Sequence, residues 1–220
     1  MNVLTIITSY NREKSLKELL SILDKQNTDI LIIDDNSSFT LDRKEFIKLK
    51  YNHGKRLMWL KFEKILSSVP KTYDYYILLP DDIHINTNFI SSAVKMWREL
   101  PDPDKICLSL LSDERVKSPN WTNFKPIVKG NYIHTQWQDF CIIFGEEFLA
   151  TKIKEVHPNR WDIVEKRLGI ELGSGLGGQI SHYWKDRGKN LYHVKESLVK
   201  HGKCESLMNP HERKINPLKA

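Results

Sequence analysis

The sequence contains little cysteine, and its cysteines are poorly placed for either a disulfide framework or a metal site. The three residues, Cys107, Cys141 and Cys204, are odd in number and widely spaced. They form neither an even, paired set nor a Cys-x-x-Cys motif, which excludes a disulfide-rich scaffold and a cysteine-based zinc site. We expect free thiols that are buried or partly buried, as free cysteine usually is.

Long hydrophobic runs are also absent from the sequence. No apolar stretch approaches the roughly 18 residues that a membrane-spanning helix requires. The chain enters a predicted strand directly, over residues 2–9, so no charged leader is followed by a long apolar region. Together these features predict a cytoplasmic protein without a transmembrane segment.

The composition is that of one ordinary globular domain, apart from a local excess of positive charge. Of its 220 residues, 40% are hydrophobic and 28% are charged. The formal net charge is +6, and residues 185–220 alone contain nine Lys or Arg against four Asp or Glu. A basic face suits a polyanion, a membrane surface or nucleotide phosphates, although an ordinary solvated surface can have the same composition.

Three apolar runs end in polar side chains that could bind a ligand. The runs, with the polar residues that follow them, are residues 75–79 with Asp81 and Asp82, residues 30–33 with Asp34 and Asp35, and residues 3–7 with Thr8 and Tyr10. In open α/β sheets, ligands bind beyond the carboxyl ends of the strands. Taken singly, these residues are equally typical of turns and helix caps. Taken together, they predict a nucleotide and a divalent metal along one sheet edge.

Hydrophobic periodicity predicts alternating strands and helices. Strands are expected over residues 2–9, 30–34, 75–79, 105–111, 140–144 and 191–194, and helices over residues 13–25, 56–69, 89–100, 146–156, 161–168 and 179–187. Residues 112–135 are polar and irregular, and predict a long loop. The order strand, helix, strand with short links implies parallel pairing, and therefore an α/β fold.

In this order, the motifs resemble those of glycosyltransferases of the GT-A fold, similar to family 2. The segments that carry the resemblance are Thr5–Arg12 (TIITSYNR), Ile32–Ser37 (IIDDNS), Leu79–Asp82 (LPDD) and, late in the chain, Ser197–His201 (SLVKH). The resemblance implies a single domain over residues 1–220, with a mixed, mostly parallel, Rossmann-like sheet flanked by helices. Residues 1–111 would form the nucleotide-sugar-binding half, and residues 112–220 the acceptor-binding half with its basic tail.

For the donor, the resemblance implies a nucleotide-sugar site at the strand ends. Tyr10 would stack on the nucleobase beside Thr8, and Asp35 would accept a hydrogen bond from the base, which favours uridine and hence a UDP-sugar. The other residues implied for donor binding are Asn11, Asp34, Lys55, Arg56, Asp81, Lys200 and Lys203. The lysines would stabilise the diphosphate by their positive charge.

For the metal, the resemblance implies a DXD-like element at Asp81-Asp82 and a late histidine, His201. Asp82 is the stronger candidate for direct contact, with Asp81 nearer the ribose or sugar. Mg²⁺ and Mn²⁺ bind carboxylate and water oxygens, and Mn²⁺ also accepts imidazole. Such an ion stabilises the negative charge that develops on a diphosphate leaving group.

The sequence departs from the family pattern at the general base. The family usually has an acidic pair before the helix that follows the acceptor loop, but no Glu-Asp pair precedes the helix expected near Gly175–Gln179. Glu171 and Asp139 are the two candidates, because a base must reach the acceptor hydroxyl. Inverting chemistry is implied by the resemblance alone. The glycine-rich run over 173–178 lacks the context of a dinucleotide-binding fingerprint.

Three classes of acceptor compete, and we favour DNA with a hydroxymethylated pyrimidine, as some phage glycosyltransferases use. The loop and tail interleave basic and aromatic side chains that could contact phosphates and stack on a base: Arg115, Lys117, Lys125, Lys129, Lys203, Arg213 and Lys214, with Trp121, Phe124, Tyr132 and Trp137. The second class is a lipid-linked or lipopolysaccharide sugar, and the third is a protein or small molecule. Alternatives of other classes are a non-catalytic nucleic-acid-binding GT-A-like module and a nucleotidyltransferase.

Overall fold

The computed structural model describes residues 1–54, 57–112, 126–135, 138, 140–153 and 176–202. Within these residues, nine strands form one sheet in the order β3-β2-β1-β4-β9-β6-β10-β8-β7. Their bounds are β1 (Val3–Ser9), β2 (Asp29–Asp34), β3 (Phe46–Lys48), β4 (Tyr75–Pro80), β6 (Lys105–Ser109), β7 (Ile127–Lys129), β8 (Tyr132–Thr135), β9 (Ile142–Phe144) and β10 (Asn190–Val194). A separate antiparallel pair joins β5 (Ile83–His84) to β11 (Lys200–His201).

The sheet is mixed, with a parallel part that begins the chain. Strands β3, β2, β1 and β4 run parallel to one another, and the parallel pairing of β1 with β2 is the one that the strand-helix-strand order predicts. Strand β9 lies antiparallel between β4 and β6, while β10 runs parallel to β6 and antiparallel to β8. The predicted fold class, a mixed sheet flanked by helices in a single domain, is therefore confirmed.

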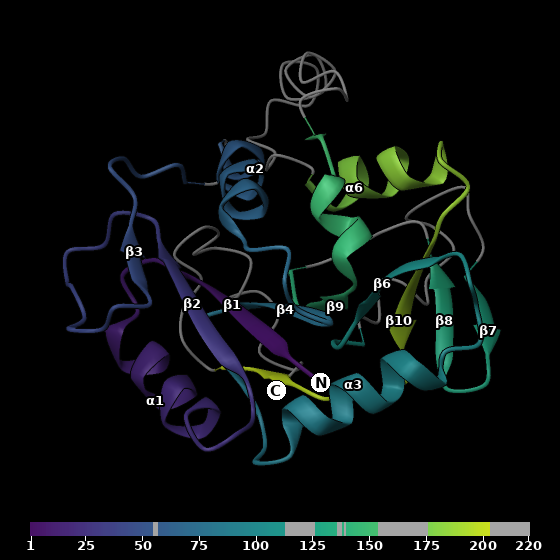
Figure 1. Ribbon diagram of the computed structural model, residues 1–220, viewed down its shortest axis with the longest axis horizontal. Helices are drawn as coiled ribbons and strands as arrows, with labels where there is room; N and C mark the ends of the chain where they lie inside the picture. Colours follow the sequence, from purple (N-terminus) through teal and green to yellow (C-terminus); the bar gives the residue numbers. More distant parts are fainter. Residues whose placement is uncertain (55–56, 113–125, 136–137, 139, 154–175, 203–220) are drawn as a thin grey trace, which may run out of the picture.

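Helices cover both faces of this sheet (Figure 1). The helical elements are α1 (Glu13–Leu23), α2 (Met58–Ser68), α3 (Phe89–Glu99), η1 (Glu146–Ala150) and α6 (Leu176–Lys185). Helices α1 and α3 pack with one hydrophobic cluster, and α2, η1 and α6 pack with the other. Alternate residues of β1 serve the two clusters: Val3 and Ile7 belong to the first, and Leu4 and Ile6 to the second. Burial on both faces explains the continuous apolar runs of the central strands.

Several predicted elements differ from the structure. The loop expected over residues 112–135 contains, in its described part, the hairpin β7-β8, which turns at Gly130 with a φ of +60°. The α-helix expected over 146–156 is a short 3-10 helix, η1, over its described residues. Strand β3 was not expected, because three residues at a sheet edge carry too little periodicity to detect. The helix expected over 161–168 lies outside the described residues.

Two remaining expectations concern the cysteines and the membrane. Cys107 and Cys141 are buried free thiols, as predicted, and burial raises the pKa of the Cys107 thiol. Cys204 lies outside the described residues. Across the described ranges, the helices are too short or too polar for any of them to cross a bilayer.

Candidate functional site

Strand β1 lies between β2 and β4, and its register brings three strand ends to one edge of the sheet. Ser9 pairs with Asp34 on one side, and Thr8 pairs with Pro80 on the other. Because the three strands are parallel, the chain leaves the sheet at this edge three times. The turns that follow the strands therefore meet, and each of them begins with a residue that the sequence analysis selected.

The first turn, after β2, is held together by Asp34. This buried carboxylate accepts hydrogen bonds from the Ser37 backbone N–H at 2.7 Å and from the Ser37 hydroxyl at 2.5 Å. The Ser37 Oγ in turn accepts the backbone N–H of Asn11 at 2.7 Å. Asn36, which lies in the turn between Asp34 and Ser37, has a φ of +63°, a conformation that asparagine tolerates better than most residues. Asp34 thus shapes the turn and links it to the end of β1.

Asp35, the next residue, fastens a distant loop to the same edge. Its Oδ1 accepts hydrogen bonds from the His53 backbone N–H at 3.0 Å and from the His53 ring Nδ1 at 2.8 Å. Its Oδ2 accepts the Gly54 backbone N–H at 3.2 Å. Gly54 has a φ of +54°, which a residue with a Cβ adopts only at a cost. The turn at residues 52–54 is therefore built around the Asp35 carboxylate.

Two lysines from α2 complete the surroundings of Asp35. The Lys61 side chain is only 3% exposed, and its Nζ lies 3.8 Å from Asp35 Oδ2. Burial lowers the pKa of Lys61 below its ordinary value of 10.5, and the charges of Asp35, Asp81 and Asp34 offset that effect in part. The Lys64 Nζ lies 3.1 Å from His53 Nε2. Because an ammonium can only donate, Nε2 must accept, so the proton of a neutral His53 is on Nδ1 and points at Asp35.

Asp81, the first of the second aspartate pair, is fixed by the end of β1. Its Oδ2 accepts hydrogen bonds from the Ser9 hydroxyl and from the Tyr10 backbone N–H, each at 3.0 Å. Its Oδ1 accepts one from Arg12 NH1, also at 3.0 Å. Burial raises the pKa of Asp81, and the donors from Tyr10, Arg12 and Ser9 counteract that rise. Both oxygens of this carboxylate are therefore already engaged by the protein.

Asp82 lies between Arg12, whose side chain is partly buried, and an exposed histidine. Its Oδ2 lies 3.2 Å from Arg12 NH1, and its Oδ1 lies 3.8 Å from His201 Nδ1. The histidine arrives through the β5-β11 pairing, in which His201 lies opposite Ile83, and through a 2.6 Å bond from the Gly202 N–H to the Asp82 carbonyl. The tertiary structure thus brings together Asp82 and His201, which are 119 positions apart in the sequence, as the resemblance implied.

The carboxylate oxygen of Asp82 and the ring nitrogen of His201 are suitable ligands for a divalent cation. Adjacent ligands of an octahedral ion with bonds of about 2.1 Å lie about 3.0 Å apart, so a small movement of the 43% exposed His201 would let both atoms bind one ion. The described residues contain no cluster of three or more His, Cys, Asp or Glu placed to hold a metal. Mg²⁺ commonly uses one or two protein carboxylates and completes its shell with water and substrate phosphates. The residues present therefore fit such an ion.

The other predicted donor-site residues within the described ranges lie around this edge. The Thr8 hydroxyl contacts the Leu79 carbonyl at 3.5 Å, and the Tyr10 side chain is partly exposed. Asn11, with a φ of +50°, accepts the Ser38 backbone N–H at 2.8 Å through its side-chain oxygen. Lys200 is exposed on β11 beside His201. Five further candidates lie outside the described residues: Lys55, Arg56, Asp139, Glu171 and Lys203.

Sequence reasoning gave no role to several residues that build the site. Arg12 was read only as part of the TIITSYNR motif, although a cation directly after Asn11 is well placed to reach carboxylates at neighbouring strand ends. Lys61 had a clearer signal, because it occupies the buried face of α2, four residues before Ile65. A charged side chain at a core position is rare unless it has a partner. His53 had no comparable signal.

One residue proposed for acceptor binding belongs to the core instead. Tyr132 is buried on β8, and its hydroxyl donates to the Met96 carbonyl at 2.8 Å. It cannot stack on a base, so that expectation was wrong. The loop expected over residues 112–135 concealed this position, because Tyr132 belongs to a mostly buried strand. The other aromatic candidates, Trp121, Phe124 and Trp137, lie outside the described residues.

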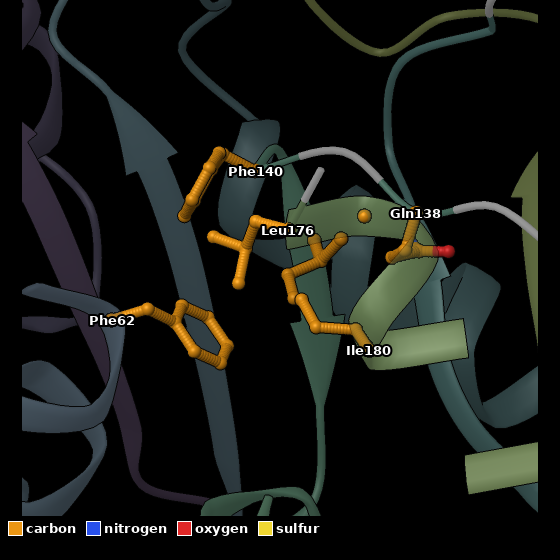
Figure 2. A pocket seen from close by; sticks show the side chains of 7 residues that line it. Phe62, Gln138, Phe140, Leu176 and Ile180 are labelled. Atoms are coloured by element: carbon orange, nitrogen blue, oxygen red, sulfur yellow. The ribbon is translucent and has the colours of Figure 1, made fainter. Parts of the chain in front are cut away.

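A small apolar cavity lies between α2, β9 and α6, and no aspartate lines it. The side chains of Phe62, Leu176 and Ile180 converge on it, with Gln138 and Phe140 at its border (Figure 2). Its volume is about 10 Å³, which is roughly the space of a single water molecule. The cavity is therefore a gap in helix packing and is too small for a sugar or a nucleotide.

No protein-family model matches the sequence, and no curated protein matches it. Solved structures do share its fold. TarS 1-349 from S. aureus aligns with 92% of this chain and 61% of its own, at 15% identity and a TM-score of 0.53. TarS 1-349 in complex with UDP-GlcNAc aligns with 94% of this chain and 60% of its own, at 14% identity and a TM-score of 0.52. The mannosyltransferase PcManGT of Pyrobaculum calidifontis, in complex with GDP-Man and Mn²⁺, aligns with 89% of this chain and 55% of its own, at 14% identity and a TM-score of 0.50.

These likenesses establish the fold, which is that of GT-A glycosyltransferases. At 14–15% identity they establish the fold alone. The chain spans only 55–61% of the lengths of these structures, so it corresponds to part of each. What the chain does must therefore be argued from the residues of its own site.

Proposed function

We propose that this protein is a metal-dependent glycosyltransferase that moves a sugar from a nucleoside diphosphate, most consistent with a UDP-sugar, to a hydroxyl group. One observation carries the proposal. On a GT-A fold, Asp35, Asp81 and Asp82 meet at the carboxyl ends of parallel strands, and His201 comes from the far end of the chain to within 3.8 Å of Asp82. A turn or a helix cap would explain either aspartate pair, but neither would explain the histidine.

In this proposal, the nucleotide lies over the turns that follow β1, β2 and β4. Tyr10 and Thr8 flank the nucleobase, and Asp35 accepts its imide N–H. Asp35 Oδ1 already receives two hydrogen bonds and Oδ2 receives one from Gly54, so a carboxylate with about four acceptor positions keeps one for the base. Uracil offers a single N–H of this kind, which supports a uridine donor.

The diphosphate would lie between Asp82 and β11. Asp82 Oδ1 and His201 Nδ1 would hold a divalent cation, and Lys200 on the same strand would add positive charge near the phosphates. When bound, such an ion neutralises the charge that develops on the leaving diphosphate. Asp81, whose oxygens are held by Ser9, Tyr10 and Arg12, would instead orient the ribose side of the site.

The two halves of the chain divide this work unequally. The nucleotide-binding residues described come from residues 1–111, while His201 and Lys200 come from the second half. The general base candidates, Glu171 and Asp139, also belong to the second half. Assignment of the base and of inverting chemistry stays a prediction, because both candidates lie outside the described residues.

The acceptor that we propose is a hydroxymethylated pyrimidine in DNA, supported by the basic charge of the second half of the chain. In the described part of this half, Lys129, Lys195 and Lys200 are exposed basic residues. The alternatives are a saccharide of lipopolysaccharide or polysaccharide, and a non-catalytic domain that only binds nucleic acid. Each gives a different result in the experiment that follows.

The test is sugar transfer with a panel of UDP-sugars and Mn²⁺, with hydroxymethylcytosine DNA and unmodified DNA offered in parallel. We expect UDP release with one donor, dependent on Mn²⁺ and on the modified DNA, and a mass increase of one hexose or related sugar on that DNA. UDP release that is independent of DNA would assign a saccharide acceptor. Mn²⁺-dependent binding of UDP without turnover on any acceptor would favour the non-catalytic alternative. A protein that binds no UDP would refute the donor site.

A further inference from the structure

The guanidinium of Arg12 occupies the position between the two carboxylates of the Asp81-Asp82 pair. A single nitrogen, NH1, lies 3.0 Å from Asp81 Oδ1 and 3.2 Å from Asp82 Oδ2. The two aspartate side chains are each only 4% exposed, and the arginine is 14% exposed. In so shielded a place, one positive charge cancels about half of the negative charge that would attract a divalent cation.

The position of Arg12 is set by the backbone and not by the carboxylates alone. Its carbonyl accepts the Leu16 N–H at 2.9 Å, so Arg12 begins the first turn of α1. The preceding residue, Asn11, has a left-handed conformation, donates its backbone N–H to Ser37 Oγ and accepts the Ser38 backbone N–H with its side-chain oxygen. The Arg12 backbone is therefore held beside the pair by contacts that do not involve the two carboxylates.

The two oxygens of Asp82 have different neighbours. Oδ2 faces Arg12, and Oδ1 faces His201, which is exposed and belongs to the two-residue strand β11. Any cation that binds to Oδ1 and the imidazole would share the Asp82 carboxylate with the guanidinium. Like charges on one carboxylate repel each other, and inside a buried site this repulsion is stronger than in water.

We propose that Arg12 is a built-in competitor for the divalent cation at Asp82 and His201. Its charge offsets part of the negative charge of the aspartate pair and holds the pair in place in the free protein, and it lowers the affinity of the site for the cation alone. A bound diphosphate brings negative charge of its own and offsets this repulsion, so cation and nucleotide bind together. This inference rests on the proposed function for the identity of the cation site, but its test needs no acceptor and no turnover.

The test is a titration with Mn²⁺ alone, followed by electron paramagnetic resonance of the free ion, on wild type and Arg12→Gln. We expect Arg12→Gln to bind Mn²⁺ roughly tenfold more tightly, because one positive charge next to the ion has been removed. Arg12→Met is a second neutral variant that keeps the apolar stem of the side chain, and it should give the same result. Arg12→Lys keeps the charge and should stay within about threefold of wild type.

The matched control is Arg43→Gln. Arg43 also forms an ion pair, with NH1 and NH2 donating to the two oxygens of Asp24, but at the other end of α1. Removing it deletes a comparable pair from the surface, so Mn²⁺ affinity should not change. A general effect of net charge on the ion would appear in Arg43→Gln as well.

Unchanged or weaker Mn²⁺ binding by both neutral variants would overturn the proposal, because Arg12 would then only fasten Asp82 in place. Equal tightening by Arg12→Lys would also overturn it, since the charge would not be the cause. Repeating the titration with UDP separates the role of Arg12 as a competitor from the proposed binding of a uridine nucleotide. We expect UDP to tighten Mn²⁺ binding more in wild type than in Arg12→Gln. A wild type that binds no UDP, with a tenfold effect of Arg12→Gln on Mn²⁺ alone, would refute the donor and leave the competitor role standing.

Discussion

The two aspartate pairs that follow β2 and β4 have the same sequence and similar burial, but different partners. Asp34 and Asp35 are surrounded by donors from their own and neighbouring turns, chiefly backbone N–H groups, a hydroxyl and an imidazole. Asp81 shares this pattern in part, whereas Asp82 is placed between the Arg12 guanidinium and an exposed histidine.

In the proposed function, this difference separates Asp34 and Asp35, which shape the turns around them, from Asp82, which would bind the cation. Donors that belong to rigid turns hold Asp34 and Asp35 in one arrangement, and through them the loops around residues 37 and 53. Asp82 instead has one oxygen directed at His201, the kind of ligand that Mn²⁺ accepts. Identical dipeptides at the ends of parallel strands therefore have different neighbours, and the proposed function assigns them different roles for that reason.

The largest expected effect comes from Asp82→Asn, which tests the ion-binding side of the comparison. The amide keeps the size of the carboxylate but loses its charge, so we expect Mn²⁺-dependent transfer to fall by roughly 10²–10³-fold. The measurement is UDP release at saturating donor, with Mn²⁺ affinity followed in parallel. Asp104→Asn removes an exposed carboxylate far from this edge and should leave both quantities unchanged. Full activity of Asp82→Asn would assign the cation elsewhere.

The next effect, on stability, comes from Asp34→Ala and tests the shape-determining side. The substitution leaves the Ser37 N–H and hydroxyl without their acceptor, which should cost about 2–3 kcal/mol in the free energy of unfolding. Urea denaturation measures this cost. The exposed Asp42→Ala should change stability by less than about 0.5 kcal/mol. A stable but inactive Asp34→Ala would contradict the comparison, because Asp34 would then have to touch the donor.

A smaller effect is expected at His53, which holds Asp35 in position. His53→Leu removes the ring donor to Asp35 Oδ1 and its link to Lys64, so UDP should bind roughly tenfold more weakly. His53→Asn can supply a side-chain N–H and should recover most of the affinity, as measured by calorimetry. If leucine and asparagine weaken UDP binding equally, the ring itself would contact the nucleotide, and the positioning role would be wrong.

The smallest effect concerns Lys61 and the dependence of stability on pH. The unfolded chain keeps the lysine proton up to the ordinary pKa of 10.5, while burial makes the folded protein lose it at a lower pH. At pH values between the lowered pKa of the folded protein and 10.5, the unfolded state therefore binds more protons than the folded state. The free energy of unfolding rises with pH over that window.

Lys61→Met removes this proton, so the unfolding free energy of wild type minus that of Lys61→Met should rise with pH below 10.5. One proton limits the slope to about 1.4 kcal/mol per pH unit. Tyrosines with raised pKa, such as Tyr73 and Tyr76, titrate near this window, but they are present in both proteins and cancel in the difference. A difference that stays flat or falls with pH would show that Lys61 is not destabilised by burial.

The elements that could be predicted are those with long or strongly periodic patterns. The runs that became β1, β2 and β4, and the helices α1 and α3, are apolar at the spacing that burial requires. The pattern failed for β3, for the hairpin β7-β8 and for η1, which are short or lie at an edge where fewer side chains are buried. Their structure depends on pairing with strands distant in sequence.

The candidate site was predictable in its residue types and not in its contacts. The sequence alone established that two buried strands end in pairs of carboxylates, because the apolar runs before Asp34 and before Asp81 predict core strands and a charge at the end of such a strand needs polar partners. It also determined the charge and fold class. The contacts follow from the tertiary structure alone: Arg12 lies between Asp81 and Asp82, His53 and Lys61 surround Asp35, and His201 comes close to Asp82. Such contacts arise from strand register and from the β5-β11 pairing, which join segments that share no local pattern.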